Sequence, residues 1–197
     1  MNKSDIISSL VEKNLGYLVV SDATAEGISR QYVTEYANSH GFERVAKGLY
    51  ISEDAWPDGM YVIQMRYPHV VFSHETALYL CGLAEREPLR YTVTACTGQR
   101  TSYLSLAGVK VYTVKKELFE VGLSEMDSPM GHRLCVYDAE RTVVDLLRSR
   151  SNVEIQTMQT ALKEYVASKS KNVPQLMRIA KQFSVDKIIS QYLEVLL

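Results

Sequence analysis

The segment 21–52 constrains the fold of this chain more than any other, because it contains a helix, a turn, a second helix and a hairpin in succession. Residues 21–28 (SDATAEGI) are typical of a short helix that ends at a turn, and residues 29–38 (SRQYVTEYAN) open a second helix. Residues 42–52 (FERVAKGLYIS) are typical of a β-hairpin that turns at a Lys-Gly pair. This order predicts a winged helix-turn-helix, a fold whose second helix enters the major groove of DNA.

The second helix of this segment has an apolar face and a polar face at a period of 3.6 residues. The residues of its apolar face, which we expect to pack inward, are Tyr32, Val33, Tyr36 and Ala37. The residues of its polar face are Arg30, Gln31, Thr34 and Asn38. An Arg side chain can form two hydrogen bonds to guanine, and a Gln side chain can form two to adenine. We therefore expect Arg30, Gln31 and Thr34 to read or flank bases, with Ser29 and Asn38 at neighbouring phosphates.

The alternative for this segment is an ordinary cluster of three helices whose exposed helix happens to carry Arg and Gln. Helical hairpins are common, and a charged outer face is usual. The hairpin directly after the helix favours DNA binding, because a basic residue and a glycine stand at its tip. We expect Lys47 to hold a phosphate beside the groove and Arg44 to hold another.

The length of 197 residues is enough for one large domain or two small ones. Apolar residues make up 46% and charged residues 23%, so neither part is predicted to be disordered. An acidic, turn-rich segment at 53–59 is the best candidate boundary. We therefore expect an α+β protein with a winged helix-turn-helix at 1–52, a linker at 53–59 and a mixed α/β domain at 60–197 that ends in a helical bundle.

The net charge of -1 carries no general signal for nucleic acid, but the charge is unevenly distributed. From Val143 onward there are eight basic and five acidic residues, whereas the first 52 residues contain five basic and six acidic ones. A basic surface on the C-terminal helices is therefore expected to add contacts to DNA phosphates. For each residue taken singly, a solvated helix face is the more common role. The candidates are Arg148, Arg150, Lys163, Lys169, Lys171, Arg178 and Lys181.

The cysteines Cys81, Cys96 and Cys135 are odd in number and lack the spacing of a zinc site. We expect buried, reduced thiols, no metal and no cofactor. The start of the sequence lacks the basic and apolar regions of a signal peptide. No apolar run approaches the ~20 residues that a membrane span needs. These features predict a soluble, cytoplasmic protein without a membrane partner.

Beyond the boundary, strands are predicted first and helices afterwards. Alternation predicts a strand at 60–67, and stretches rich in Val, Thr and Tyr predict strands at 89–96, 108–115 and 133–137. Helices are expected at 73–83 with Ser73 as N-cap and at 139–149 with Asp138 as N-cap. A capping box of Ser151 and Glu154 is expected to open a helix at 152–168, and two more helices to fill 172–197. At the start of the chain, Asn2 is expected to cap a helix of about a dozen residues.

Three motifs follow one another along the chain: KGLY at 47–50, FSHETALYLCGL at 72–83 and DAERTVVDLL at 138–147. In this order they resemble the AbiEi antitoxins of type IV toxin–antitoxin systems, which are also regulators of phage-defence operons, and the resemblance covers essentially the whole chain. No single motif is as specific as a nucleotide-binding loop, but three in register are hard to obtain by chance. One departure is Cys81, which stands where a histidine is expected, so an ionisable group is not required there.

The resemblance implies a winged helix that represses its own promoter by binding inverted repeats in double-stranded DNA. It also implies a C-terminal domain that neutralises a nucleotidyltransferase toxin of the AbiEii type without forming a stable complex with it. Such a protein is expected to be a monomer in solution, with cooperative binding on DNA as an option.

Ser73, His74 and Glu75 stand together at a helix start, which raises the alternative of a nucleophilic enzyme. Adjacent residues of a helix point in different directions, so we do not expect them to form a hydrogen-bonded relay. Capping and packing explain all three, and we expect no catalytic residues. The alternative function is a winged-helix regulator whose α/β domain senses a ligand or carries an unrecognised enzymatic site. A pocket lined by convergent polar groups in that domain would favour the alternative.

Overall fold

A computed structural model describes residues 2–196 of the chain. The chain divides into two compact units. Unit 1 contains the residues up to Pro68 together with Asp127–Arg133, and unit 2 contains His69–Met126 and the residues from Leu134 onward. Among the described residues there are eleven α-helices and two β-sheets, and the protein belongs to the α+β class.

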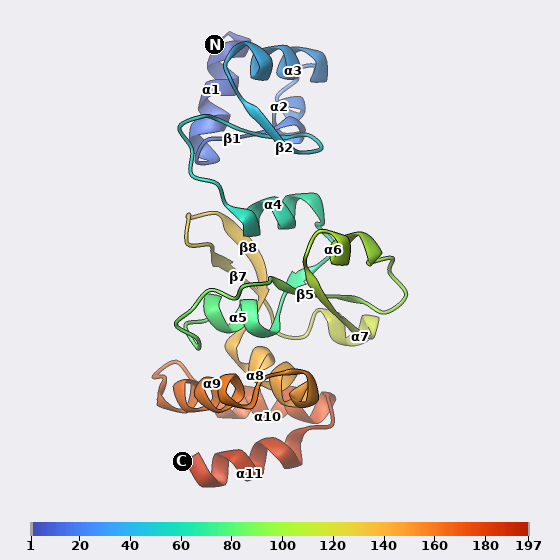
Figure 1. Ribbon diagram of the computed structural model, residues 1–197, viewed down its shortest axis with the longest axis vertical. Helices are drawn as coiled ribbons and strands as arrows, with labels where there is room; N and C mark the ends of the chain where they lie inside the picture. The colour runs from blue at the N-terminus through green and yellow to red at the C-terminus, as the bar shows by residue number, and fades with distance from the viewer. Residues whose placement is uncertain (1, 197) are drawn as a thin grey trace. The chain divides into compact units, whose positions relative to one another are not determined.

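Unit 1 begins with helix, strand, helix, helix and hairpin (Figure 1). Its elements are α1 (Lys3–Lys13), β1 (Tyr17–Val19), α2 (Val20–Ala25), α3 (Arg30–Ser39), β2 (Glu43–Ala46), β3 (Leu49–Ile51) and α4 (Gly59–Arg66). The strands form an antiparallel sheet in the order β1-β3-β2. The register between β2 and β3 shifts between Arg44 and Ala46, a bulge beside the turn of the hairpin. Gly48 has a φ of +74° in that turn, a conformation that favours glycine, as the Lys-Gly pair predicted.

The core of unit 1 lies between α1, α2, α3 and the sheet. Val33 and Ala37 of α3 are fully buried, and Tyr32 and Tyr36 are partly buried, which confirms the apolar face expected for this helix. The capping box of α1 confirms the role of Asn2, whose side chain accepts a hydrogen bond from the Asp5 N–H at 2.8 Å.

Residues 59–66 form α4, so the strand predicted at 60–67 is wrong. The Asp58 carboxylate accepts a hydrogen bond from the Tyr61 N–H at 3.0 Å and caps the helix. Met60 and Tyr61 are neighbours in sequence and are both buried, whereas a strand with one buried face buries alternate residues. The division of the chain also differs from the predicted linker at 53–59, because unit 1 continues through α4 to Pro68.

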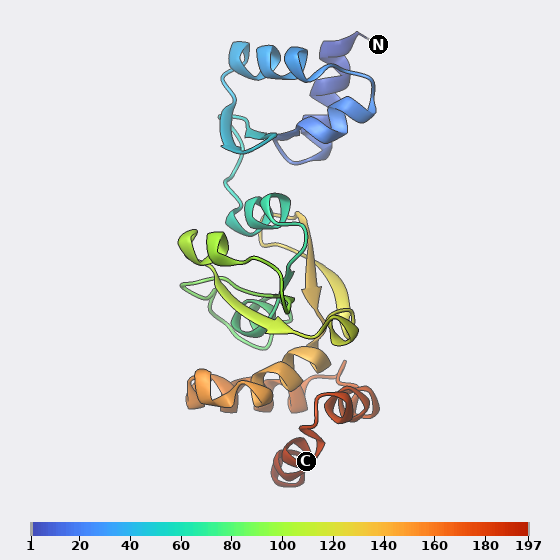
Figure 2. The same ribbon diagram turned by 90° about the vertical axis from the view of Figure 1, so that its right-hand side faces the viewer.

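The remaining elements contain the second sheet and a group of C-terminal helices. The strands are β4 (Val71–Phe72), β5 (Thr92–Cys96), β6 (Lys110–Val114), β7 (Leu123–Asp127) and β8 (Arg133–Tyr137). The helices are α5 (His74–Leu80), α6 (Ser102–Leu106), α7 (Lys116–Phe119), α8 (Ala139–Arg148), α9 (Ile155–Ala167), α10 (Val173–Gln182) and α11 (Asp186–Leu196), with a 3-10 turn at Arg150–Asn152. The sheet order is β6-β5-β4-β8-β7, with β4 antiparallel to β5 and parallel to β8. The helices α8 to α11 gather on one side of this sheet (Figure 2).

Two of the predicted caps in this region differ in outcome. Asp138 caps α8 as expected, because its side chain accepts a hydrogen bond from the Arg141 N–H at 2.7 Å. The capping box of Ser151 and Glu154 is wrong: Ser151 lies in the 3-10 turn, and Glu154 is the N-cap of α9 without a side-chain hydrogen bond. The extra turn separates α8 from α9 and takes Ser151 out of reach of the first N–H groups of α9.

Candidate nucleic-acid interface

The outer face of α3 carries the polar side chains that the sequence singled out. Arg30, Gln31, Thr34 and Asn38 are all exposed. Arg30, Thr34 and Asn38 follow at intervals of four residues and therefore lie along one side of the helix. The Arg30 guanidinium forms no hydrogen bond or ion pair with the residues that the structure describes. Its donors are available to a partner outside the chain.

Three of the candidate residues on this helix have internal hydrogen bonds. The Gln31 amide donates to Glu35 Oε1 at 2.9 Å, and the Thr34 hydroxyl donates to the Arg30 carbonyl at 3.0 Å. The Ser29 hydroxyl caps the helix by accepting from the Tyr32 N–H at 3.3 Å. A base contact by Gln31 therefore requires that its amide leave Glu35, which reduces the net gain from that contact.

The hairpin that follows α3 is tied to the rest of unit 1 at its turn. The Val20 N–H donates to the Gly48 carbonyl at 2.9 Å and links the turn to the start of α2. Lys47 at the tip and Arg44 on β2 are both exposed. The Arg44 Nε donates to the Ala46 carbonyl at 3.3 Å, which orients this side chain along the bulge. Two cations thus project from a hairpin whose turn is fixed to α2.

The seven C-terminal candidates belong to unit 2 and are spread over several elements. All seven side chains are exposed. Arg178 and Lys181 are neighbours on the surface of α10, three residues apart. Arg148 is already engaged, because its Nη2 donates to the Thr113 carbonyl at 3.3 Å and its Nη1 lies 3.8 Å from Asp145 Oδ1. The others are Arg150 after α8, Lys163 on α9, and Lys169 and Lys171 between α9 and α10.

A buried polar cluster that the sequence did not reveal ties Asp127–Arg133 into unit 1. Asp58 is 4% exposed, and its Oδ2 lies 2.8 Å from His132 Nδ1. The same oxygen accepts a hydrogen bond from the Ser128 hydroxyl. The Asp58 N–H donates to the Tyr17 hydroxyl at 2.8 Å, and the His132 ring stacks on Tyr61 with ring centroids 4.1 Å apart. Asp58 therefore joins β1 through its N–H, and the start of α4 and a chain segment far along the sequence through its carboxylate.

The adjacent pair Ser73 and His74 departs from the expectation that such neighbours do not bond to each other. His74 is 2% exposed and has a φ of +49°, a left-handed conformation that non-glycine residues rarely adopt. Its Nδ1 lies 3.0 Å from Ser73 Oγ, and its Nε2 lies 3.1 Å from Ser149 Oγ. Ser73 is the N-cap residue of α5 but makes no capping hydrogen bond, because its hydroxyl is used by His74 and Thr94.

These hydrogen bonds connect three elements of unit 2. The Thr94 hydroxyl donates to Ser73 Oγ at 2.8 Å, and the same Oγ lies 3.0 Å from His74 Nδ1. On its other side, the His74 ring contacts Ser149 through Nε2. These contacts link α5 to β5 and to the end of α8.

We expect the stability of unit 2 to fall as the pH is lowered below about 6.5 because of His74. Burial, with the positive charges of Lys110, Arg141 and Arg148 around it, holds the pKa of His74 well below its ordinary value. The unfolded chain binds this proton from about pH 6.5 downward and the folded chain does not, so the loss approaches about 1.4 kcal/mol per pH unit. His74→Asn, which tolerates the positive φ, should remove this slope. Urea unfolding of both proteins between pH 7.5 and 5 checks it, and equal slopes would contradict the prediction.

The three cysteines are free and partly buried. Burial raises the pKa of Cys81 to about 12, and its thiol donates to the Tyr137 carbonyl at 3.6 Å. Among residues 2–196, no group of three or more His, Cys, Asp or Glu side chains is arranged to hold a metal ion. Within the same range, no helix has the length and apolar character that crossing a bilayer demands.

Comparisons with known proteins concern the fold alone. No protein-family model matches the chain, and no curated protein matches it. Among solved structures, the chain is similar to the crystal structure of the Rv2827c protein from Mycobacterium tuberculosis, with a TM-score of 0.59 and 14% sequence identity. The match covers 89% of this chain and 70% of that chain.

Proposed function

We propose that this chain is a DNA-binding regulator in which unit 1 is a winged helix-turn-helix. The observation that carries the proposal is the exposed polar face of α3, where Arg30, Gln31, Thr34 and Asn38 lie together and Arg30 is uncommitted. The order of elements and the hairpin with exposed Arg44 and Lys47 directly after α3 also support it. In this proposal α3 enters the major groove and the hairpin contacts the flanking backbone.

We further propose that the regulated promoter is its own and that the protein is the antitoxin of a type IV toxin–antitoxin system. In this role it acts in the cytoplasm, binds inverted repeats in its promoter, and counteracts a nucleotidyltransferase toxin through residues of unit 2 without a stable complex. The support for this part is the resemblance of the KGLY, FSHETALYLCGL and DAERTVVDLL motifs to AbiEi antitoxins. The exposed cations of unit 2 provide candidates for additional phosphate contacts.

Arg30→Ala should weaken binding to the operator by about 1–3 kcal/mol and weaken binding to scrambled DNA much less. The reason is that a bidentate contact to guanine is lost, and this contact exists only at the correct base pair. Titration of both DNA duplexes at one salt concentration measures the two affinities. Equal losses on both duplexes would make Arg30 a phosphate contact.

Lys47→Ala is the matched comparison on the hairpin. It should weaken binding on all sequences alike and lower the slope of log K against log salt by about one unit. Lys13→Ala, which removes an exposed cation from the end of α1, is the control for net charge and should leave the slope unchanged. An unchanged slope for Lys47→Ala would mean that the hairpin does not contact DNA.

The antitoxin part of the proposal predicts a separation of functions. Arg30→Ala should release repression of a promoter fusion and still rescue cells that express the nucleotidyltransferase toxin from an independent promoter. The rescue is expected to persist because a residue of the DNA-reading helix has no role in acting on a toxin. Growth and reporter activity measured in one strain test both halves, and loss of rescue in this variant would contradict the division.

A second candidate function has a specific observation in its favour. The described part of unit 2 has cavities that include one of about 640 Å³, lined by residues such as Arg150 and Tyr192, and one of about 980 Å³, lined by residues such as Glu75 and Lys110. Cavities of this size are typical of small-molecule sites. A winged-helix regulator whose second unit senses a small ligand is therefore the alternative to an antitoxin.

A further inference from the structure

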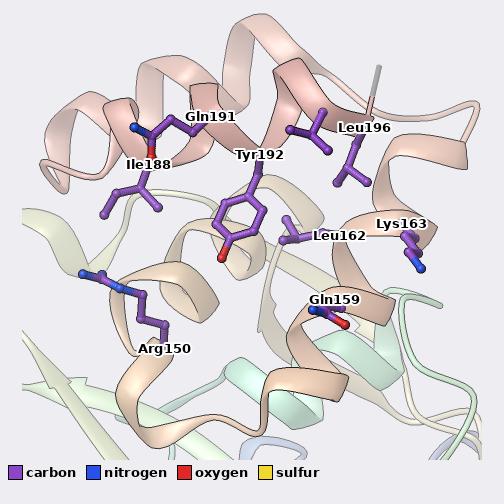
Figure 3. Close-up of a pocket in the computed structure, with 9 residues that line it drawn as sticks. Arg150, Gln159, Leu162, Lys163, Ile188, Gln191, Tyr192 and Leu196 are labelled. Carbon is purple, nitrogen blue, oxygen red and sulfur yellow. The ribbon is translucent and has the colours of Figure 1, made fainter.

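The smaller cavity lies between two helices of the C-terminal group. Its volume is about 640 Å³, within the range of small-molecule sites. Figure 3 shows α11 on one side with Ile188 and Tyr192, and α9 on the other side with Leu162. The Tyr192 ring projects from α11 toward α9.

The middle of this cavity is apolar. Leu162 is 3% exposed and forms part of its floor, and Ile188 and Tyr192 are partly buried beside it. Val195 at the edge is 84% exposed, so an apolar side chain is left in water next to the cavity. A flat apolar body between α9 and α11 would cover these groups and gain from the burial of both surfaces.

The charged side chains that line the cavity are all positive. None of the nine residues that line it is acidic, and two of them, Arg150 and Lys163, are cations. These two lie toward opposite ends, with Tyr192 between them (Figure 3). The Lys163 ammonium has no hydrogen-bond partner among the residues that the structure describes. Arg150 donates one hydrogen bond, from Nη1 to the Leu147 carbonyl. The amides of Gln159 and Gln191 add neutral donors.

We propose that this cavity is a binding site for a small organic anion with a flat apolar body, held by the apolar side chains in the middle and by Arg150 or Lys163 at its charged group. A DNA backbone offers charge but no apolar body for Tyr192 and Val195, so the apolar lining favours an organic anion over a DNA phosphate as the ligand of this cavity. The inference does not rest on DNA binding by unit 1.

The test uses two fluorescent probes that differ by one charged group. 8-Anilinonaphthalene-1-sulfonate has an aromatic body with a sulfonate, and N-phenyl-1-naphthylamine has the same body without it. The full-length chain should bind the sulfonate more tightly. Arg150→Gln combined with Lys163→Gln should raise the dissociation constant of the sulfonate by about tenfold, as expected for the loss of a charge-assisted hydrogen bond, and leave that of the neutral probe unchanged.

A single isosteric substitution provides a second test of the charge preference of the cavity. Gln159→Glu places a carboxylate at the cavity and should weaken binding of the sulfonate probe only. Gln182→Glu on α10, outside the lining, should weaken binding of neither probe. All these side chains are exposed, so the variants are expected to fold. The proposal is overturned if the sulfonate affinity is the same in the native chain, the double variant and Gln159→Glu, or if both probes lose affinity equally.

Discussion

Replacing Arg141 with methionine should lower the free energy of unfolding of unit 2 by about 3–5 kcal/mol, because it leaves a buried carboxylate without its nearer cation. Arg141 is 0% exposed, and its Nε donates to Asp145 Oδ2 at 3.0 Å. Its Nη1 donates to the Leu118 carbonyl at 2.8 Å and also to the Val121 carbonyl. The guanidinium carbon lies 4.1 Å from the Tyr137 ring centroid and 4.2 Å from that of Phe183. Methionine fills the space between the rings but satisfies neither the carboxylate nor the carbonyls.

The pH dependence of this loss distinguishes a stranded charge from poor packing. Burial already raises the pKa of Asp145, and loss of Arg141 removes the main influence that lowers it. In the variant the carboxyl can take up a proton, so the destabilisation should shrink as the pH is lowered and grow as the pH rises. Urea unfolding followed by circular dichroism at pH 5 and 8 measures both values. A loss that is independent of pH would contradict the argument from charge.

Two matched variants accompany Arg141→Met. Adding Asp145→Leu removes both charges and should restore much of the lost stability, since a buried ion pair is often replaceable by apolar residues of similar volume. Arg178→Met removes an exposed cation of α10 and should change the stability by no more than about 0.5 kcal/mol. A double variant that is as unstable as Arg141→Met alone would show that the carbonyls of Leu118 and Val121, rather than Asp145, carry the dependence on Arg141.

Replacing Asp58 with alanine should destabilise unit 1 by a similar amount, about 3–5 kcal/mol, since three hydrogen bonds to one buried carboxylate disappear together. The Tyr61 N–H loses its cap, and Ser128 and His132 lose the acceptor that holds them in unit 1. Hydrogen exchange resolved by peptide should show faster exchange in α4 and in Asp127–Arg133, with unit 2 unchanged.

The controls for Asp58→Ala separate the cap from the link to residues 127–133. Asp58→Asn keeps an acceptor for the Tyr61 N–H but offers an amide to donors, so its loss of stability should be intermediate. Asp54→Ala removes an exposed carboxylate four residues earlier and should have no effect. Slow exchange of Asp127–Arg133 in Asp58→Ala would mean that the segment is held by other contacts.

The sequence was sufficient where a side chain acts on the backbone next to it. Asn2 and Asp138 cap their helices, and the Lys47-Gly48 turn closes the hairpin, because each of these interactions is complete within three or four residues. The faces of α3 were predictable for a related reason: burial repeats with the period of the helix.

The sequence was insufficient where tertiary contacts determine the local structure. Residues 60–67 alternate like a strand, but the cap from Asp58 and the burial of Met60 and Tyr61 make them a helix. The pair of Asp58 and His132 is separated by 74 residues, so no local pattern reveals it. The contact between Ser73 and His74 depends on a left-handed backbone at His74, which neighbouring residue types do not predict. The cavity at Tyr192 likewise forms only when α11 returns to α9.

The position of His132 in the chain determines when unit 1 can complete its folding during translation. When the first 68 residues have been synthesised, α1 to α4 and Asp58 are present, but Ser128 and His132 are not. During this interval the Asp58 carboxylate lacks these two partners and is hydrated by water, so unit 1 cannot reach its final form. Its last piece arrives only with residue 133, after most of the second sheet has been synthesised. Translation speed between residues 68 and 133 therefore determines how long the growing chain exposes an unfinished unit 1.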